Sequence, residues 1–86
     1  MQDYTWMDLD EVLKYLPEMK KEKVSEVARS SRGFLTIYRK YKEPSKMPYY
    51  WVRRRFGFIA RHLVQYRKNP TYRRKLALIA WAYNPS

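Results

Sequence analysis

Residues 48–68 read PYYWVRRRFGFIARHLVQYRK, a stretch that contains one glycine and no proline after its first residue. Proline suits the first turn of a helix, and the following pair Asn69-Pro70 would stop one. Apolar side chains recur at helical spacing and share one face of this stretch: Val52, Phe56, Ile59, Ala60 and Leu63. The pattern therefore predicts a helix over about residues 48–68, the longest in the protein.

Another helix is predicted directly downstream, over about residues 72–83. Thr71 is a suitable N-cap, and the pair Asn84-Pro85 would close the helix. Its circumference is mostly apolar, with the run LALIAWA at residues 76–82. A helix that is apolar on nearly all sides is usually buried, so we expect this C-terminal helix to form the centre of the core.

Three shorter helices are expected upstream. The first has an apolar face with side chains at positions i, i+3, i+4 and i+7, namely Leu9, Val12, Leu13 and Leu16. Thr5 would cap it, and Pro17 would end or kink it. A second helix is predicted over about residues 18–29, with a narrow apolar stripe of Val24, Val27 and Ala28. A third runs from Phe34 to a point before Pro44.

Together these elements predict an all-α fold, a compact single-domain bundle of four to five short helices over residues 1–86. A chain of 86 residues has a small core. Its hydrophobic content of 45% and aromatic content of 17% are nevertheless too high for a disordered tail. We therefore expect the whole chain to fold as one unit.

Charge is divided unevenly along the chain. Residues 1–28 carry seven Asp and Glu and four Lys, a net charge of −3. Residues 29–86 carry fifteen Lys and Arg and one acid, Glu43, a net charge of +14. A segment with so many uncompensated cations repels itself, and a polyanion would relieve the repulsion. This division into an acidic N-terminal part and a basic body predicts a nucleic-acid partner.

The first candidate site is the polar face of the helix at 48–68. At 100° per residue, the cations Arg54, Arg61 and Lys68 lie above one another, opposite the apolar face. Arginines at this spacing can follow a phosphate backbone through paired hydrogen bonds. The consecutive residues Arg53, Arg54 and Arg55 strengthen the prediction, because almost no acids lie nearby. The alternative is an ordinary solvated helix face.

The second candidate is the corner between the last two helices. Its cations are Arg67 and Lys68 before the turn, and Arg73, Arg74 and Lys75 after it. Three cations at a helix N-terminus oppose the helix dipole, and a bound anion would relieve that conflict. We therefore expect an anion site in this corner, unless the charges only keep the protein soluble.

Two further stretches supply possible secondary contacts. The segment Ser30-Ser31-Arg32-Gly33 between two helices has the outline of a helix-turn-helix, whose second helix would expose Arg39, Lys40 and Lys42. A common αα-corner is the alternative. Tyr49 and Tyr50 adjoin the arginine run and could stack on unpaired bases, or could rim a core closed by Trp51.

Two interpretations of the acidic N-terminal helices are open: they fold back and screen the basic body, or they stay separate and offer a second surface to a protein partner. Surface ion pairs contribute only about 0–1 kcal/mol each, so charge alone is a weak reason for them to dock on the basic body. Burying the four apolar side chains of the first helix could contribute several kcal/mol, at about 1.5–3 kcal/mol each. We expect that helix to pack either on its own chain or on a second copy, which would give a homodimer through the N-terminal helix.

Catalysis is not expected. The single histidine, His62, has one acid in the basic body to partner it, Glu43. No cysteine is present, which removes disulfides and thiolate metal ligands, so we expect no metal site and no cofactor. The polar start of the chain and the short apolar runs predict neither a signal peptide nor a transmembrane segment. We expect a soluble, cytoplasmic protein.

These observations predict a small basic helical protein that binds DNA or RNA mainly through phosphate-backbone contacts, with an accessory or regulatory role. An alternative is a protein–protein adaptor or inhibitor that docks on an acidic partner surface. A third possibility is a protein that binds an anionic membrane surface.

Overall fold

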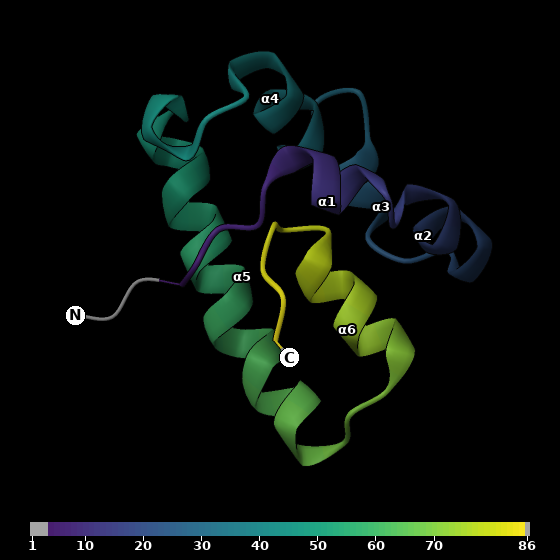
Figure 1. The fold of residues 1–86 in the computed structure, drawn as a ribbon. Helices are drawn as coiled ribbons and strands as arrows, with labels where there is room; N and C mark the ends of the chain where they lie inside the picture. The colour runs from purple at the N-terminus through teal and green to yellow at the C-terminus, as the bar shows by residue number, and fades with distance from the viewer. Residues whose placement is uncertain (1–3, 86) are drawn as a thin grey trace.

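Helix α5 (Tyr49–Lys68) spans 20 residues and forms one long side of the molecule (Figure 1). The structure is a computed structural model, and it describes residues 4–85. The other helices of these residues are α1 (Leu9–Leu13), α2 (Leu16–Glu22), α3 (Glu26–Arg29), α4 (Phe34–Tyr41), the 3-10 helix η1 (Pro44–Lys46) and α6 (Tyr72–Ile79). No strand occurs within residues 4–85, so the predicted all-α fold is confirmed, as is the position of its longest helix.

The first predicted helix is shorter than expected. Helix α1 begins after Asp8, whose backbone is extended (φ −61°, ψ 145°), so Thr5 is not its N-cap. It ends at Leu13, and Pro17 lies in the first turn of α2. Because the first turn of a helix tolerates proline, Pro17 helps to begin a new helix and does not end the previous one.

The second predicted helix, over residues 18–29, is broken into α2 and α3. Lys23 and Ser25 both have a left-handed backbone, with φ of 55° and 56°. The N–H of Val24 donates to the carbonyl of Met19 at 2.9 Å, the bond that closes a helix after a left-handed residue. This turn buries Val24 and Met19 in the core. It also rotates Val27 outward, where 70% of its surface is exposed, so the predicted apolar stripe is wrong at that residue.

The C-terminal segment lies at the centre of the core, as predicted. Most of residues 76–82 are buried, and Leu76, Leu78, Ile79, Ala80 and Ala82 have no exposed surface. Helix α6 ends at Ile79, four residues earlier than expected. Ala82 then takes a left-handed backbone (φ 60°), and the N–H of Tyr83 donates to the carbonyl of Leu78 at 3.1 Å. The predicted Thr71 cap is confirmed, since its side chain accepts a hydrogen bond from the N–H of Arg74 at 3.2 Å.

The apolar face of α1 is covered by its own chain. Val12 is fully buried, and Leu9 and Leu16 pack against the same core cluster, which includes Phe34 and Leu76. Of the two expected arrangements, the structure shows packing on the same chain. The apolar face that suggested a homodimer therefore packs on the core of its own chain.

The segment before α1 lies against α5 and the end of α6 (Figure 1). The N–H of Met7 donates to the carbonyl of Ala82 at 2.7 Å, and the hydroxyl of Tyr38 donates to the carbonyl of Met7 at 2.8 Å. Burial raises the pKa of that hydroxyl. These contacts tie the segment before α1 to the end of the C-terminal core segment and to α4.

Candidate nucleic-acid interface

A groove of about 920 Å³ lies between α3 and α5. One wall is the segment Ser25–Ala28 at the start of α3. The other wall is the arginine face of α5. The α5 residues that line it are Tyr49, Tyr50, Arg53, Arg54, Gly57, Phe58, Arg61 and His62. Sequence reasoning missed this groove because α3 was expected to continue α2 with Val27 facing the core.

The α5 wall carries two tyrosines in the first turn of the helix and three arginines further along it. Arg53, Arg54 and Arg61 are all exposed, and the spacing of Arg54 and Arg61 places both at the groove as the helical pattern predicts. The guanidinium of Arg54 lies 5.5 Å from the ring centre of Tyr50 and 5.1 Å from that of Trp51. Its Nη1 donates to the Tyr50 hydroxyl at 3.1 Å. These contacts hold the cation beside an aromatic ring that is 63% exposed.

The floor of the groove is aromatic. The rings of His62 and Phe58 stack with centroids 3.9 Å apart, and Phe58 stacks on Trp81 at 4.9 Å. Trp81 in turn stacks on the buried Phe34 at 4.8 Å. The groove therefore ends on a column of rings that continues into the core, so its floor is apolar and firmly supported.

His62 has a depressed pKa. Burial lowers the pKa below its usual value of 6.5, and the positive charge of Arg61 lowers it further. Among the lining residues, Glu26 of α3 is the acid that could oppose this effect. His62 therefore favours its neutral form near pH 7.

This depressed pKa predicts a pH-dependent stability. The unfolded chain binds a proton at His62 more readily than the folded chain, so the free energy of unfolding should fall as pH drops below about 6.5. The decrease should end once pH passes the lower folded pKa. Thermal unfolding of the wild-type protein and His62→Gln between about pH 7.5 and 5.5 measures it. Equal pH slopes for the two proteins would contradict the prediction.

The predicted role of Arg55 as a phosphate contact is wrong. Its side chain is 1% exposed, and its guanidinium donates to four backbone carbonyls. These belong to Trp81 at 2.8 Å, Tyr4 at 3.1 Å, Thr5 at 2.9 Å and Ala82 at 3.0 Å. The guanidinium also lies 3.9 Å from the ring centre of Trp6. Because these donors point into the protein, Arg55 is a structural residue and is removed from the predicted phosphate contacts.

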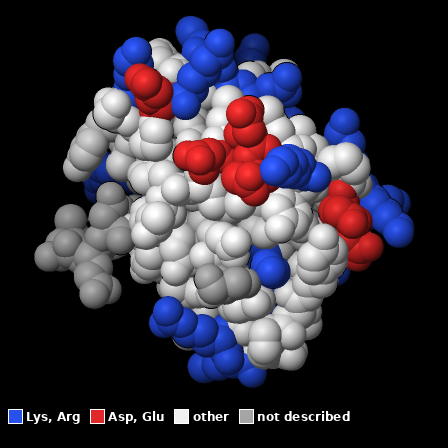
Figure 2. All heavy atoms as spheres, viewed as in Figure 1, with Lys and Arg blue, Asp and Glu red and all other residues white. Residues whose placement is uncertain are grey.

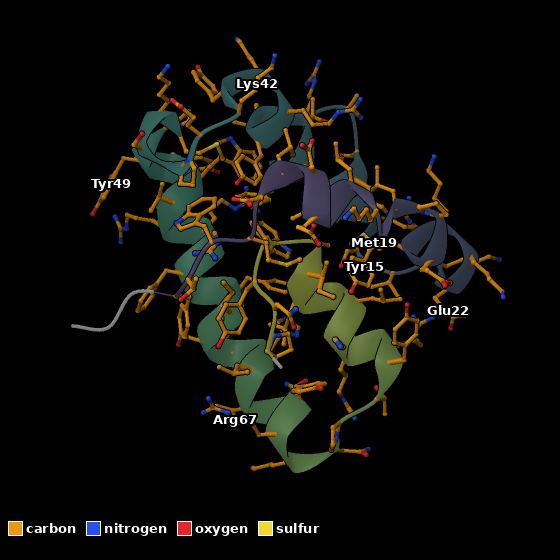
Figure 3. The ribbon with its side chains drawn as sticks, viewed as in Figure 1. Tyr15, Met19, Glu22, Lys42, Tyr49 and Arg67 are labelled. Atoms are coloured by element: carbon orange, nitrogen blue, oxygen red, sulfur yellow. The ribbon has the colours of Figure 1, made fainter. Side chains whose placement is uncertain are left out.

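The predicted corner lies at the far end of α5, where the chain turns into α6 (Figure 1). Arg67 and Lys68 are exposed, and Arg67 projects outward from the opposite end of the helix to Tyr49 (Figure 3). Arg73 Nη1 donates to the carbonyl of Glu22, and Arg74 Nη1 donates to the carbonyl of Asn69 at 2.9 Å.

These two carbonyls belong to the C-terminal ends of α2 and α5, which carry partial negative charge. Arg73 and Arg74 therefore have partners within the protein, and no anion is needed to explain their position. Lys75 is half-buried. Of the corner residues, Arg67 and Lys68 retain the clearest access to a ligand, and Lys68 continues the face of Arg54 and Arg61.

The helix-turn-helix outline has little support in the geometry. Its first helix, α3, is a single turn of four residues. Arg32, Arg39, Lys40 and Lys42 are all exposed, but none of them lines the groove. Tyr49 and Tyr50 do line it and are 74% and 63% exposed.

Acidic side chains do not neutralise the basic body in the described part of the chain. Two ion pairs form within residues 4–85: Lys14 with Glu11 at 2.9 Å, and Lys46 with Glu43 at 3.1 Å. Each joins neighbours on one turn, and neither connects the acidic N-terminal part to the basic body. Figure 2 shows most of the acidic side chains on this face over α1 and α2, with a further acidic group at the upper left, and all of them lie apart from the basic side chains at the turn between α5 and α6.

Comparison of the chain with protein-family models, curated proteins and solved structures returned no match. Among the described residues, none of the helices has the length and apolar character needed to cross a membrane. The same residues contain no cluster of three or more His, Asp or Glu side chains placed to hold a metal ion. The candidate site therefore rests on the groove and its arginines.

Proposed function

We propose that this protein binds nucleic acid, mainly through phosphate contacts, as a non-enzymatic accessory or regulatory factor. The observation that carries the proposal is the net charge of +14 over residues 29–86, whose exposed arginines on α5 form no ion pair with the acidic helices. Guanidinium groups held in a row on a rigid helix suit phosphate oxygens, which accept paired hydrogen bonds. The contact set we assign is Arg53, Arg54, Arg61 and Lys68, with Arg67 beside them.

A salt series tests the proposal. Fluorescence anisotropy with labelled DNA and RNA, at several salt concentrations, should give an affinity that falls steeply and linearly on a log–log plot. The double variant Arg54→Gln, Arg61→Gln should bind all sequences more weakly and reduce the slope by about two, since two phosphate contacts are lost.

The matched control removes two cations elsewhere. Lys20 and Lys21 are exposed on α2, and Lys20→Gln with Lys21→Gln changes the net charge by the same amount. This control should leave the slope close to that of the wild-type protein. Equal losses in both variants would indicate that net charge alone matters, and no binding at low salt would end the proposal.

Docking on an acidic protein surface is the second candidate function. The exposed Val27 at the groove favours docking of a protein segment. Its apolar side chain could pack on an apolar residue of the segment while the arginines pair with the acidic ones. A pull-down in the presence of nuclease distinguishes the two. One saturable protein partner, with weak binding to every oligonucleotide, would support this candidate.

A further inference from the structure

We propose that the groove between α3 and α5 receives an unpaired base, so that the preferred ligand is single-stranded nucleic acid. This inference rests on the proposed function and specifies its ligand class. It starts from three properties of the groove that phosphate binding alone does not require: an aromatic floor, exposed tyrosines on the wall, and a glycine in the middle of α5.

The floor and the rim suit different parts of a nucleotide. Phe58, His62 and Trp81 provide a stacked apolar surface at the base of the groove. Arg54 and Arg61 stand on its α5 wall. A base has a flat face that fits against aromatic rings, while its phosphates need the cations. The volume of about 920 Å³ is within the usual range of small-ligand sites, about 300–1,000 Å³.

The ring of Tyr50 is held in an orientation in which a base could stack on it. Its ring contacts Trp51 edge-on, with centroids 5.7 Å apart, and its hydroxyl accepts a hydrogen bond from Arg54. The ring is therefore oriented before any ligand arrives, yet more than half of its surface is exposed. Stacking on such a ring loses little side-chain freedom, because the ring is already held.

Gly57 supplies independent support. A glycine inside a helix is unfavourable relative to alanine, because it loses more backbone freedom on folding. The fold does not require it: a Cβ at this position would meet only the Nη1 atom of Arg61, at an ordinary 3.4 Å. The residue lies between the arginines on the groove wall, where the missing side chain lets a ligand approach the α5 backbone closely.

A duplex makes poorer use of this groove. Its bases are stacked inside, so its phosphates could reach Arg54 and Arg61 while the aromatic floor stayed empty. Single strands are recognised by the combination found here, a cationic track beside aromatic faces. The groove therefore favours an unpaired strand over a duplex of the same sequence.

The test compares one labelled sequence as a single strand and as a duplex, at the same salt concentration. The wild-type protein should bind the single strand about ten-fold more tightly. A 2-aminopurine base in that strand should lose fluorescence on binding, because it stacks. Gly57→Leu, which fills the groove, and Tyr50→Leu, which removes the ring, should each lower single-strand affinity to near the duplex value. Duplex affinity should fall by less than single-strand affinity in both variants, since Arg54 and Arg61 themselves remain.

Val64→Leu is the matched control, because Val64 is an exposed residue of α5 outside the groove. It should leave both affinities unchanged. Tyr50→Leu keeps the test valid even if Gly57→Leu does not fold. Equal wild-type affinities for both forms, or unquenched 2-aminopurine, would overturn this inference and leave the proposed function standing. No binding to either form at low salt would remove both. Tighter binding of an acidic peptide than of the single strand, abolished by Gly57→Leu, would assign the groove to a protein segment and overturn the inference.

Discussion

Replacing Arg55 with methionine should lower the free energy of unfolding by about 4 kcal/mol. The side chain is buried, and its guanidinium donates to carbonyls of both the N-terminal segment and the turn after α6. Methionine would leave those carbonyls without this donor inside the protein, and a buried acceptor that loses its partner is costly. For a domain of this size the loss corresponds to a decrease in Tm of about 20 °C.

Arg54→Met is a closely matched control, because Arg54 is the adjacent arginine and its side chain is exposed. Its free energy of unfolding should change by less than about 0.5 kcal/mol. Arg55→Lys should fall between the two, since lysine keeps the charge but cannot reach four carbonyls from a planar fork. Chemical denaturation and calorimetry measure all three. Similar Tm values for Arg54→Met and Arg55→Met would contradict the structural role assigned to Arg55.

Gly33→Ala should also be strongly destabilising, by about 3 kcal/mol or more. Gly33 lies where α4 begins directly against α3. A Cβ there would clash with the carbonyl oxygen of Val27 and would lie 2.6 Å from that of Ala28. Backbone atoms cannot turn aside as a side chain can, so α3 would have to move away from α4.

Gly57→Ala is the comparison for this prediction. Its new Cβ meets only the end of a flexible arginine, so it should raise the free energy of unfolding by up to about 1 kcal/mol through better helix propensity. The same substitution should therefore have opposite effects at the two glycines. A stable, unchanged Gly33→Ala protein in chemical denaturation would show that α3 and α4 do not pack as closely as described.

The substitutions at Arg55 and Gly33 should also displace the walls and floor of the groove. Arg55 anchors the turn that contains Trp81, and Trp81 supports the ring stack of the groove floor. Gly33 holds α3, which provides the opposite wall, against α4. A loss of ligand affinity in either variant would follow from the displaced walls. Substitutions at exposed residues and at Gly57 leave these supports in place, so they test ligand binding without displacing the walls.

The helical spacing of α5 itself distinguishes Arg55 from its neighbours. At 100° per residue, position 55 lies on the same side of the helix as Val52 and Ile59, which were predicted to face inward. The charge of the run Arg53-Arg54-Arg55 suggested three surface cations. The angular position alone would have separated the buried arginine from its two exposed neighbours.

The fold class, helices α4, α5 and α6, the Thr71 cap and the buried C-terminal segment followed from local pattern. Each depends on residues within a few turns of one another, through apolar spacing, capping side chains or proline positions. The excess of cations after residue 28 was equally plain from composition. The break of the second helix at Lys23 and Ser25 was not predicted, since both residues adopt a backbone conformation that their types seldom take.

Packing between distant segments settled the remaining features. Arg55 bonds to residues 26 to 51 positions away, and the groove has α3 on one side and, on the other, a face of α5 more than twenty residues further along the chain. No local pattern encodes such pairings, because they arise only when separate helices bury their apolar faces in one core. Composition therefore predicts an anionic partner, whereas long-range packing determines which arginines can meet it and what surface lies beside them.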